Sequence, residues 1–153
     1  MLVTRRQILG GLAGLGVLGL GAGGVRYWLG RSENVATHDY ELIAAPVDIE
    51  LVAGHITPAW GYGGHAPGVE IRCRQGERLR VRFINKLPEP TTIHWHGMRL
   101  PLAMDGVPYV SQLPVQPGEY FDYSFITPDA GSYWYHPHTS SSEQLGHGLV
   151  GPL

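Results

Sequence analysis

Apolar and charged residues alternate one by one through the middle of the chain, and this period of two predicts β-strands with one buried face. The alternation covers two runs, residues 69–74 and 78–83, and the segment Gln75-Gly76-Glu77 between them predicts a hairpin turn. The apolar positions of the two runs are Val69, Ile71, Cys73, Leu79, Val81 and Phe83. The two runs therefore predict a pair of half-buried strands.

Further strands are predicted on both sides of these runs. They cover approximately residues 40–52, 91–97, 119–126 and 131–136. Turn signals separate them, at Pro58, residues 61–64, Pro67-Gly68, residues 88–90, Pro117-Gly118 and residues 129–131. No stretch beyond residue 30 has a clear period of 3.6, so many short strands predict an antiparallel sandwich or barrel.

The first thirty residues predict an export signal rather than part of the fold. Arg5 and Arg6 precede an uncharged, glycine-rich apolar run over residues 8–25, and this order is typical of a twin-arginine signal. The alternative is an uncleaved transmembrane anchor, which the many glycines disfavour. The predicted domains are therefore a signal segment, residues 1–30, and one domain, residues 31–153.

Composition excludes several classes of protein. The single cysteine excludes an internal disulfide framework and a zinc site built from several thiolates. Three of the 11 basic residues lie in the signal segment, which leaves 8 basic against 13 acidic residues and a net charge of −5. An acidic body argues against nucleic acid as a partner.

Two histidine pairs indicate metal chemistry: His94 with His96, and His136 with His138. On a strand, residues i and i+2 project from one face about 6.6 Å apart, a spacing that suits two neighbouring metal ions. If the two strands lie side by side, four imidazoles converge. Imidazole suits copper, zinc, iron and nickel rather than magnesium or calcium. Pro137 is expected to end strand pairing near His136.

Four segments in this order resemble the N-terminal cupredoxin domain of the laccase-like multicopper oxidase family. They are His94-Trp95-His96-Gly97, residues 103–108, residues 112–119 and Gly131-Ser132-Tyr133-Trp134-Tyr135-His136-Pro137-His138. The resemblance covers approximately residues 38–153 and implies an all-β, Greek-key β-sandwich of the cupredoxin type. Gly64 and Val69 stand where the family often has Asn and Pro.

The resemblance also implies a ligand set. In that family, four copper ions carry electrons from a substrate to dioxygen, and three of them form a trinuclear centre. By position, His94 would bind the type 2 copper, His96 and His136 would share one type 3 copper, and His138 would bind the other. Asp105 resembles a carboxylate that orients a copper-bound water or relays protons. Its alternative role is that of a turn residue before Gly106.

The family's other ligand motifs, His-x-x-His-x-His and His-Cys-His, are not found in the sequence. Cys73 has no neighbouring histidine and is predicted to be a small buried apolar residue. We therefore expect half of a trinuclear site. The chain alone should lack a blue copper band and oxidase activity, and its cluster face should expose an apolar wall.

These expectations define three hypotheses. In the first, the chain is the N-terminal portion of an exported, periplasmic multicopper oxidase, or a membrane-tethered one if the signal stays uncleaved. Its partners are then dioxygen, an unknown reducing substrate, absent C-terminal cupredoxin domains and the twin-arginine export machinery. In the second, it is a stand-alone periplasmic protein that sequesters copper. In the third, it is an interaction domain without metal, which retention of the four histidines disfavours.

The remaining histidines and the arginine stripe have simpler interpretations. His38, His55 and His65 have no partner spacing and are expected on the surface, and a ligand role for His147 is disfavoured. Met98 and Met104 are expected to pack rather than bind copper. The stripe formed by Arg78, Arg80 and Arg82 is interpreted as a solvated strand face balanced by Glu70 and Glu77, in preference to an anion-binding patch.

Overall fold

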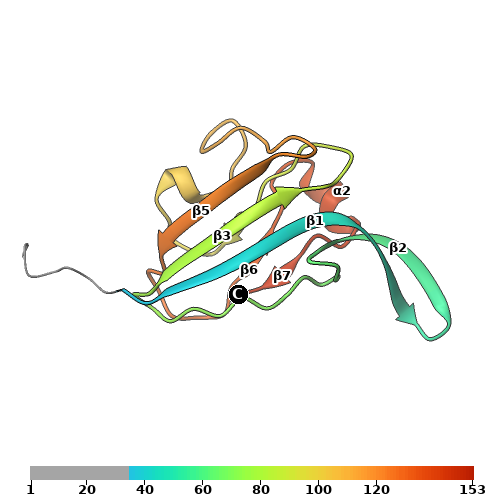
Figure 1. Cartoon of the computed structure of the whole chain (residues 1–153), viewed down its shortest axis with the longest axis horizontal. Helices are drawn as coiled ribbons and strands as arrows, with labels where there is room; N and C mark the ends of the chain where they lie inside the picture. The colour runs from blue at the N-terminus through green and yellow to red at the C-terminus, as the bar shows by residue number, and fades with distance from the viewer. Residues whose placement is uncertain (1–34) are drawn as a thin grey trace, which may run out of the picture. The chain divides into compact units, whose positions relative to one another are not determined.

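Two β-sheets form the part of the chain that the computed structural model describes, residues 35–153 (Figure 1). One sheet has the strand order β2-β1-β3-β5 and the other β4-β6-β7. The predicted all-β sandwich is confirmed. The predicted signal segment, residues 1–30, lies outside the described residues. Among the described residues, no helix has the length and apolar character needed to cross a membrane.

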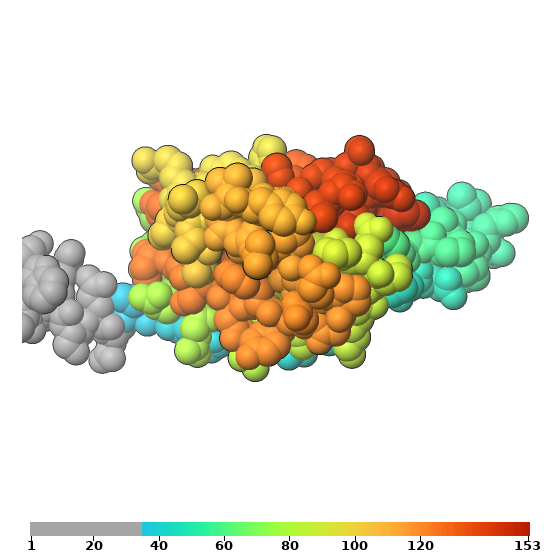
Figure 2. All heavy atoms as spheres, turned by 90° about the horizontal axis from the view of Figure 1, so that it is seen from above, coloured from blue at the N-terminus to red at the C-terminus, as the bar shows by residue number. Residues whose placement is uncertain are grey.

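The four-stranded sheet is organised around one long strand that changes partner. Its strands are β1 (Thr37–Val52), β2 (His55–Tyr62), β3 (Arg78–Asn85) and β5 (Tyr120–Ile126). The first half of β1 pairs in parallel with β3, as far as Ala44 opposite Asn85. From Ala44 onward, β1 pairs antiparallel with β2. The resulting β1–β2 arm projects beyond the rest of the sheet (Figures 1 and 2).

The smaller sheet consists of β4 (His94–His96), β6 (Trp134–His136) and β7 (Gly151–Pro152). Two short helical segments accompany it: η1 (Leu102–Met104), a 3-10 turn, and α2 (Ser141–Gly146). The predicted strand over residues 91–97 is thus a three-residue strand, and the one over 131–136 begins at Trp134. Strands β4 and β7 both pair antiparallel with β6, which lies at the centre of this sheet.

Aromatic side chains from both sheets meet in the core. In β3, Leu79, Val81 and Phe83 are buried while the residues between them face solvent, as the period of two predicts. From the smaller sheet, Trp95 is fully buried, with its ring 5.4 Å from the ring of Tyr123 and 5.3 Å from that of Phe125. Burial of large aromatic side chains dominates the stabilisation of such a core.

The hairpin predicted around Gln75-Gly76-Glu77 is wrong. Residues 69–74 form no strand, and the neighbours of β3 are β1 and β5. The segment runs along the other sheet instead, where the Ile71 N–H donates to the carbonyl oxygen of Pro152 at 3.0 Å. The alternation of residues 69–74 correctly predicted that one face of this segment is buried, since Ile71 is buried. It carries no information about which strand provides the hydrogen bonds.

Strand β2 was not predicted from the sequence. Pro58 was expected to be a turn, yet it lies within β2. The turn expected over residues 61–64 is confirmed only at residues 63–64, because β2 extends to Tyr62. Proline is tolerated because β2 is an edge strand. Pro46 lies on β1 after Ala44, where the pairing of β1 with β3 ends. The edge of β1 that faced β3 therefore needs no N–H donor at Pro46. Helix α2 was missed because six residues are too few to display a helical period.

The arginine stripe is a solvated face, as predicted, but its counter-charges differ from those expected. Arg80 donates to both carboxylate oxygens of Asp39 at 2.6 and 2.9 Å, and Arg82 to both of Asp122 at 2.8 Å. Each pair joins directly opposed residues of neighbouring strands. Glu70 and Glu77 lie before the strand and contact other residues. Exposed pairs of this kind contribute about 0.2–1 kcal/mol.

Replacement of Tyr135 by Phe tests how the 69–74 segment is held. The Tyr135 hydroxyl donates to the Val69 carbonyl oxygen at 2.7 Å. Its loss should lower the free energy of unfolding by about 0.5–1.5 kcal/mol, because the half-buried Val69 carbonyl oxygen loses its hydrogen-bond partner. Urea denaturation measures this change. The control Tyr120→Phe, on an exposed tyrosine, should change stability by less than about 0.5 kcal/mol. Equal effects would contradict the assignment.

Candidate metal centre

The pairing of β4 with β6 determines which residues form the candidate centre. His94 lies opposite His136 in the antiparallel register, and His96 lies opposite Trp134. Because alternate residues of a strand share a face, both histidines of β4 and His136 project from one side of the sheet. The intervening residues, Trp95 and Tyr135, project from the other side and are fully buried in the core.

The four predicted histidine rings converge. The ring centroid of His94 lies 5.8 Å from that of His96, 5.4 Å from that of His136 and 5.2 Å from that of His138. Ligand nitrogens of three of them, His94, His96 and His136, all lie within 4.8 Å of one another. The structure thus brings together every histidine that the sequence singled out for metal binding.

Backbone carbonyl groups fix the tautomers of two rings. The Nδ1 atom of His94 lies 2.7 Å from the carbonyl oxygen of Asp105, and Nδ1 of His136 lies 2.8 Å from that of Pro137. A carbonyl oxygen only accepts hydrogen bonds, so each Nδ1 carries the proton and donates. Each Nε2 atom therefore keeps its lone pair for a metal ion.

The closest pair of nitrogens suits a single ion. Nδ1 of His96 and Nε2 of His136 are 3.2 Å apart. Two imidazole nitrogens bound at about 2.0–2.1 Å to one tetrahedral ion lie about 3.3 Å apart. An all-imidazole donor set favours copper, zinc, iron or nickel over magnesium and calcium. The donors present therefore fit the metal that the family resemblance implies.

Aromatic packing and burial hold the cluster rigid on one side. The Trp134 ring stacks on His136 at 4.1 Å and lies 4.8 Å from the His96 ring. His136 is buried, whereas His96 and His138 are exposed. Burial lowers the pKa of His136, and the neighbouring imidazoles lower it further. The neutral, metal-binding form of this ring is thereby favoured at neutral pH.

Asp105 occupies the turn considered from the sequence, and its carboxylate lies beside the histidine cluster. It follows η1 and precedes Gly106, which has a φ of 77°. A Cβ atom at Gly106 would lie 1.7 Å from the Ile93 carbonyl oxygen, so only glycine lets this turn approach β4 so closely. The approach brings the Asp105 carboxylate Oδ1 to 3.4 Å from Nδ1 of His94. The turn thus places the Asp105 carboxylate next to the four-histidine cluster.

A buried polar network that sequence reasoning missed supports the start of β4. Gln144, fully buried in α2, donates to the Glu89 carboxylate at 2.6 Å and to the Pro90 carbonyl oxygen at 3.0 Å. The Thr91 hydroxyl donates to Gln144 at 2.7 Å. The His138 N–H donates to the Thr92 hydroxyl at 3.2 Å. The hydrogen-bonded residues lie about 50 positions apart in sequence, so no local sequence pattern predicts these contacts.

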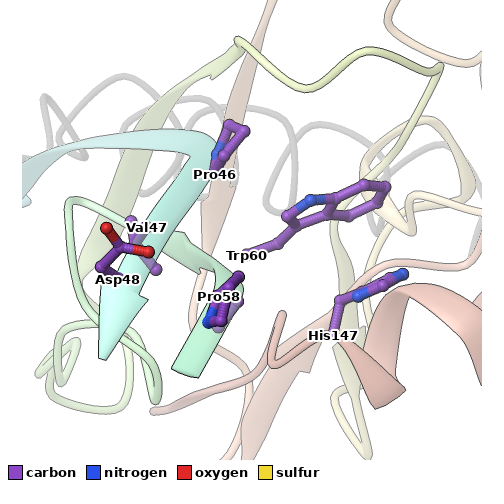
Figure 3. Close-up of a pocket in the computed structure, with 7 residues that line it drawn as sticks. Pro46, Val47, Asp48, Pro58, Trp60 and His147 are labelled. Carbon is purple, nitrogen blue, oxygen red and sulfur yellow. The ribbon is translucent and has the colours of Figure 1, made fainter. Parts of the chain in front are cut away.

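The other histidines lie elsewhere. His55 and His65 are exposed, as expected. The His147 ring stacks on Trp60 at 4.5 Å beside a cavity of about 330 Å³ that Pro46 and Pro58 also line, as Figure 3 shows. His38, also expected on the surface, is half-buried on β1, and its Nε2 lies 2.6 Å from a carboxylate oxygen of Glu77.

Both methionines pack, as predicted. Met98 is buried, and Met104 packs against the core. Cys73 is half-buried rather than fully buried. It contributes nothing to the four-histidine cluster, and burial raises the pKa of its thiol.

Comparisons with known proteins agree with this geometry. A family profile described as multicopper oxidase matches residues 45–153. Copper resistance protein A of Pseudomonas syringae pv. tomato is 36% identical over 158 residues, covering 98% of this chain and 25% of that protein. Multicopper oxidase MmcO of Mycobacterium tuberculosis is 36% identical over 138 residues, covering 87% of this chain and 27% of that protein. The chain thus spans about a quarter of these curated relatives.

Solved structures give the same result. The multi-copper oxidase from Pseudomonas thermotolerans is 82% identical, with a TM-score of 0.76 over 78% of this chain and 29% of that chain. Lac15 from a marine microbial metagenome is 46% identical, with a TM-score of 0.72 over 76% of this chain and 32% of that chain. The fold, the converging imidazoles and the profile match lead to one conclusion: the chain belongs to the multicopper oxidase family.

Proposed function

We propose that this chain is the copper-binding N-terminal portion of an exported multicopper oxidase and supplies half of a trinuclear copper site. The observation that carries the proposal is the convergence of four imidazoles from β4 and the end of β6, with two nitrogens 3.2 Å apart. The names of the relatives and the family profile favour copper among the metals that imidazole binds.

Each histidine has a proposed role. His94 binds the type 2 copper, His96 and His136 share one type 3 copper, and His138 binds the other. The 3.2 Å separation of the His96 and His136 nitrogens supports their sharing of one ion. When bound, the copper ions would supply electron transfer to dioxygen, which is reduced to water while a substrate is oxidised. The protein's own contribution is to hold neutral imidazoles in fixed tautomers before metal arrives.

The remaining ligands are proposed to come from a further cupredoxin domain that packs on this face. Supporting this, the segment around Asp105 exposes large apolar side chains, with Leu102 at 63%, Tyr109 at 80% and Leu113 at 74% exposure. This segment lies within the yellow and orange surface in Figure 2. Large apolar side chains exposed along one segment indicate an interaction surface. The greater length of the relatives also supports additional domains.

Export to the periplasm completes the proposal. It is supported by Arg5 and Arg6 before the uncharged run over residues 8–25. The twin-arginine route carries folded proteins, which is compatible with a domain that assembles a metal site before transport.

Replacement of His96 by Ala tests the copper cluster directly. Because His96 is exposed, the change should leave folding intact and weaken cupric affinity by more than the about 10–100-fold typical of outer-shell partners. Copper titration followed by electron paramagnetic resonance measures both stoichiometry and ligand nitrogens. The control is His55→Ala, which removes an exposed imidazole from β2.

The outcome also separates the alternatives. Equal copper binding by the two variants would contradict the proposed ligand set. Absence of copper binding in the unaltered chain would favour a domain without metal. Stoichiometric binding that addition of a C-terminal cupredoxin domain does not alter would favour a stand-alone copper-sequestering protein.

Replacement of Asp105 by Asn tests the carboxylate. The main-chain carbonyl that accepts from His94 is retained, so the His94 tautomer is preserved while the charge 3.4 Å from that ring is removed. Copper affinity should fall about tenfold and the paramagnetic spectrum should change. The midpoint of urea denaturation without metal should stay the same. A shift in that midpoint with an unchanged spectrum would assign Asp105 to the turn alone.

The pH dependence of stability tests the burial of His136. Its pKa lies below the ordinary value of 6.5, so between these two values the unfolded chain binds more protons than the folded chain. Stability of the metal-free chain should therefore decline as pH falls below 6.5 and level off below the lowered pKa. Urea denaturation across this range, compared with His136→Gln, isolates the effect. Parallel curves for the two chains would contradict it.

A further inference from the structure

A second group of metal-ligand side chains lies outside the four-histidine cluster. His38, Cys73 and Glu77 each offer one ligand atom, and the three atoms all lie within 4.8 Å of one another. His38 is the second residue of β1, while the other two flank the turn that precedes β3. All three are half-buried. Imidazole, thiolate and carboxylate are the three protein donors that zinc uses.

We propose that these three side chains form a site for a divalent zinc-like ion. Around a tetrahedral zinc ion with bonds of about 2.0–2.3 Å, donor atoms lie about 3.3–3.6 Å apart. The donor atoms are already close to that spacing: His38 Nε2 and Glu77 Oε2 are 2.6 Å apart, and all three donor atoms lie within 4.8 Å of one another. Side-chain movements of about 1 Å convert the existing hydrogen bond into a coordination sphere.

Neighbouring groups already orient the donors. The Arg74 N–H donates to the Glu77 carboxylate at 3.1 Å, and Arg74 Nη1 lies 3.8 Å from its other oxygen. The Thr127 hydroxyl lies 3.7 Å from the Cys73 sulfur and donates to the Glu77 carbonyl oxygen at 3.0 Å. The main-chain N–H of Arg74 thus orients the Glu77 carboxylate, and an outer hydrogen bond of this kind to a ligand increases metal affinity.

The site is accessible and leaves a coordination position free. Cys73 lines a cavity of about 470 Å³, and the side chain of His38 is 36% exposed. Three protein donors leave the fourth tetrahedral position to water, as in zinc sites that are not purely structural. Cys73 from its cavity and His38 from its exposed edge can therefore both be reached from solvent.

This site goes beyond the proposed oxidase function and does not depend on it. It shares no residue with the four-histidine cluster. Parallel pairing of β1 with β3 begins at Thr37 opposite Arg78, so an ion held by His38 and Glu77 would join the two strands where their ladder starts. Binding to the folded state alone would raise stability by mass action.

Cobalt titration of the full chain under a phosphine reductant provides the test. Cys73 is the single cysteine, so a near-ultraviolet sulfur-to-cobalt charge-transfer band reports this site and is silent to cobalt on the four histidines. We expect the charge-transfer band to reach its full intensity when one equivalent of cobalt is bound at this site. Addition of zinc should then displace the cobalt and abolish the band. No band at saturating cobalt would overturn the proposal.

Matched variants identify the donors. Cys73→Ser should abolish the band, and His38→Gln or Glu77→Gln should weaken cobalt affinity by at least about tenfold. His55→Gln, on an exposed residue, should leave it unchanged. Urea denaturation without metal verifies that each variant folds. A band of full affinity in both His38→Gln and Glu77→Gln would show cobalt held by the thiol without the proposed partners, and would also overturn the proposal.

Discussion

The antiparallel pairing of β4 with β6 is the constraint on which the rest of the structure depends. Each of these strands is only three residues long, yet their register sends imidazoles to one face and Trp95 and Tyr135 into the core. A slip by one residue would exchange the two faces. The aromatic core and the candidate copper ligands are therefore specified by the same few hydrogen bonds, and stability of the sandwich preserves the geometry of the site.

Preorganisation at this face relies on main-chain atoms more than on side-chain partners. The carbonyl oxygens of Asp105 and Pro137 hold two rings in the tautomer that leaves Nε2 free. Burial keeps His136 neutral, so little protonation opposes metal binding near neutral pH. The exposed rings, His96 and His138, face the side on which a further domain is proposed. Rigidity is thus concentrated on the inner half of the cluster.

The sequence predicted the sandwich and the shared face of His94 and His96 because both depend on spacing along one strand, where residues i and i+2 share a face whatever the strand's neighbours are. His138 lies beyond the end of β6 at His136, so its approach to the other rings depends on tertiary structure. Strand pairing could not be predicted in the same way: the 69–74 segment alternates correctly but pairs elsewhere. The contact of His38 with Glu77 and the Gln144 network join residues about 40 to 55 positions apart. Only tertiary structure reveals such groups.

The main chain and the side chain of Asp105 make different contacts with His94. Its main-chain carbonyl oxygen accepts a hydrogen bond from Nδ1 of His94, while its carboxylate lies 3.4 Å from the same nitrogen. Any amino acid provides that carbonyl oxygen, provided that the following glycine is kept. Mutation of the Asp105 codon can therefore alter the charge beside His94 without disturbing the orientation of that ring. A lineage could vary the electrostatics of the four-histidine cluster here through single substitutions and still inherit an intact histidine.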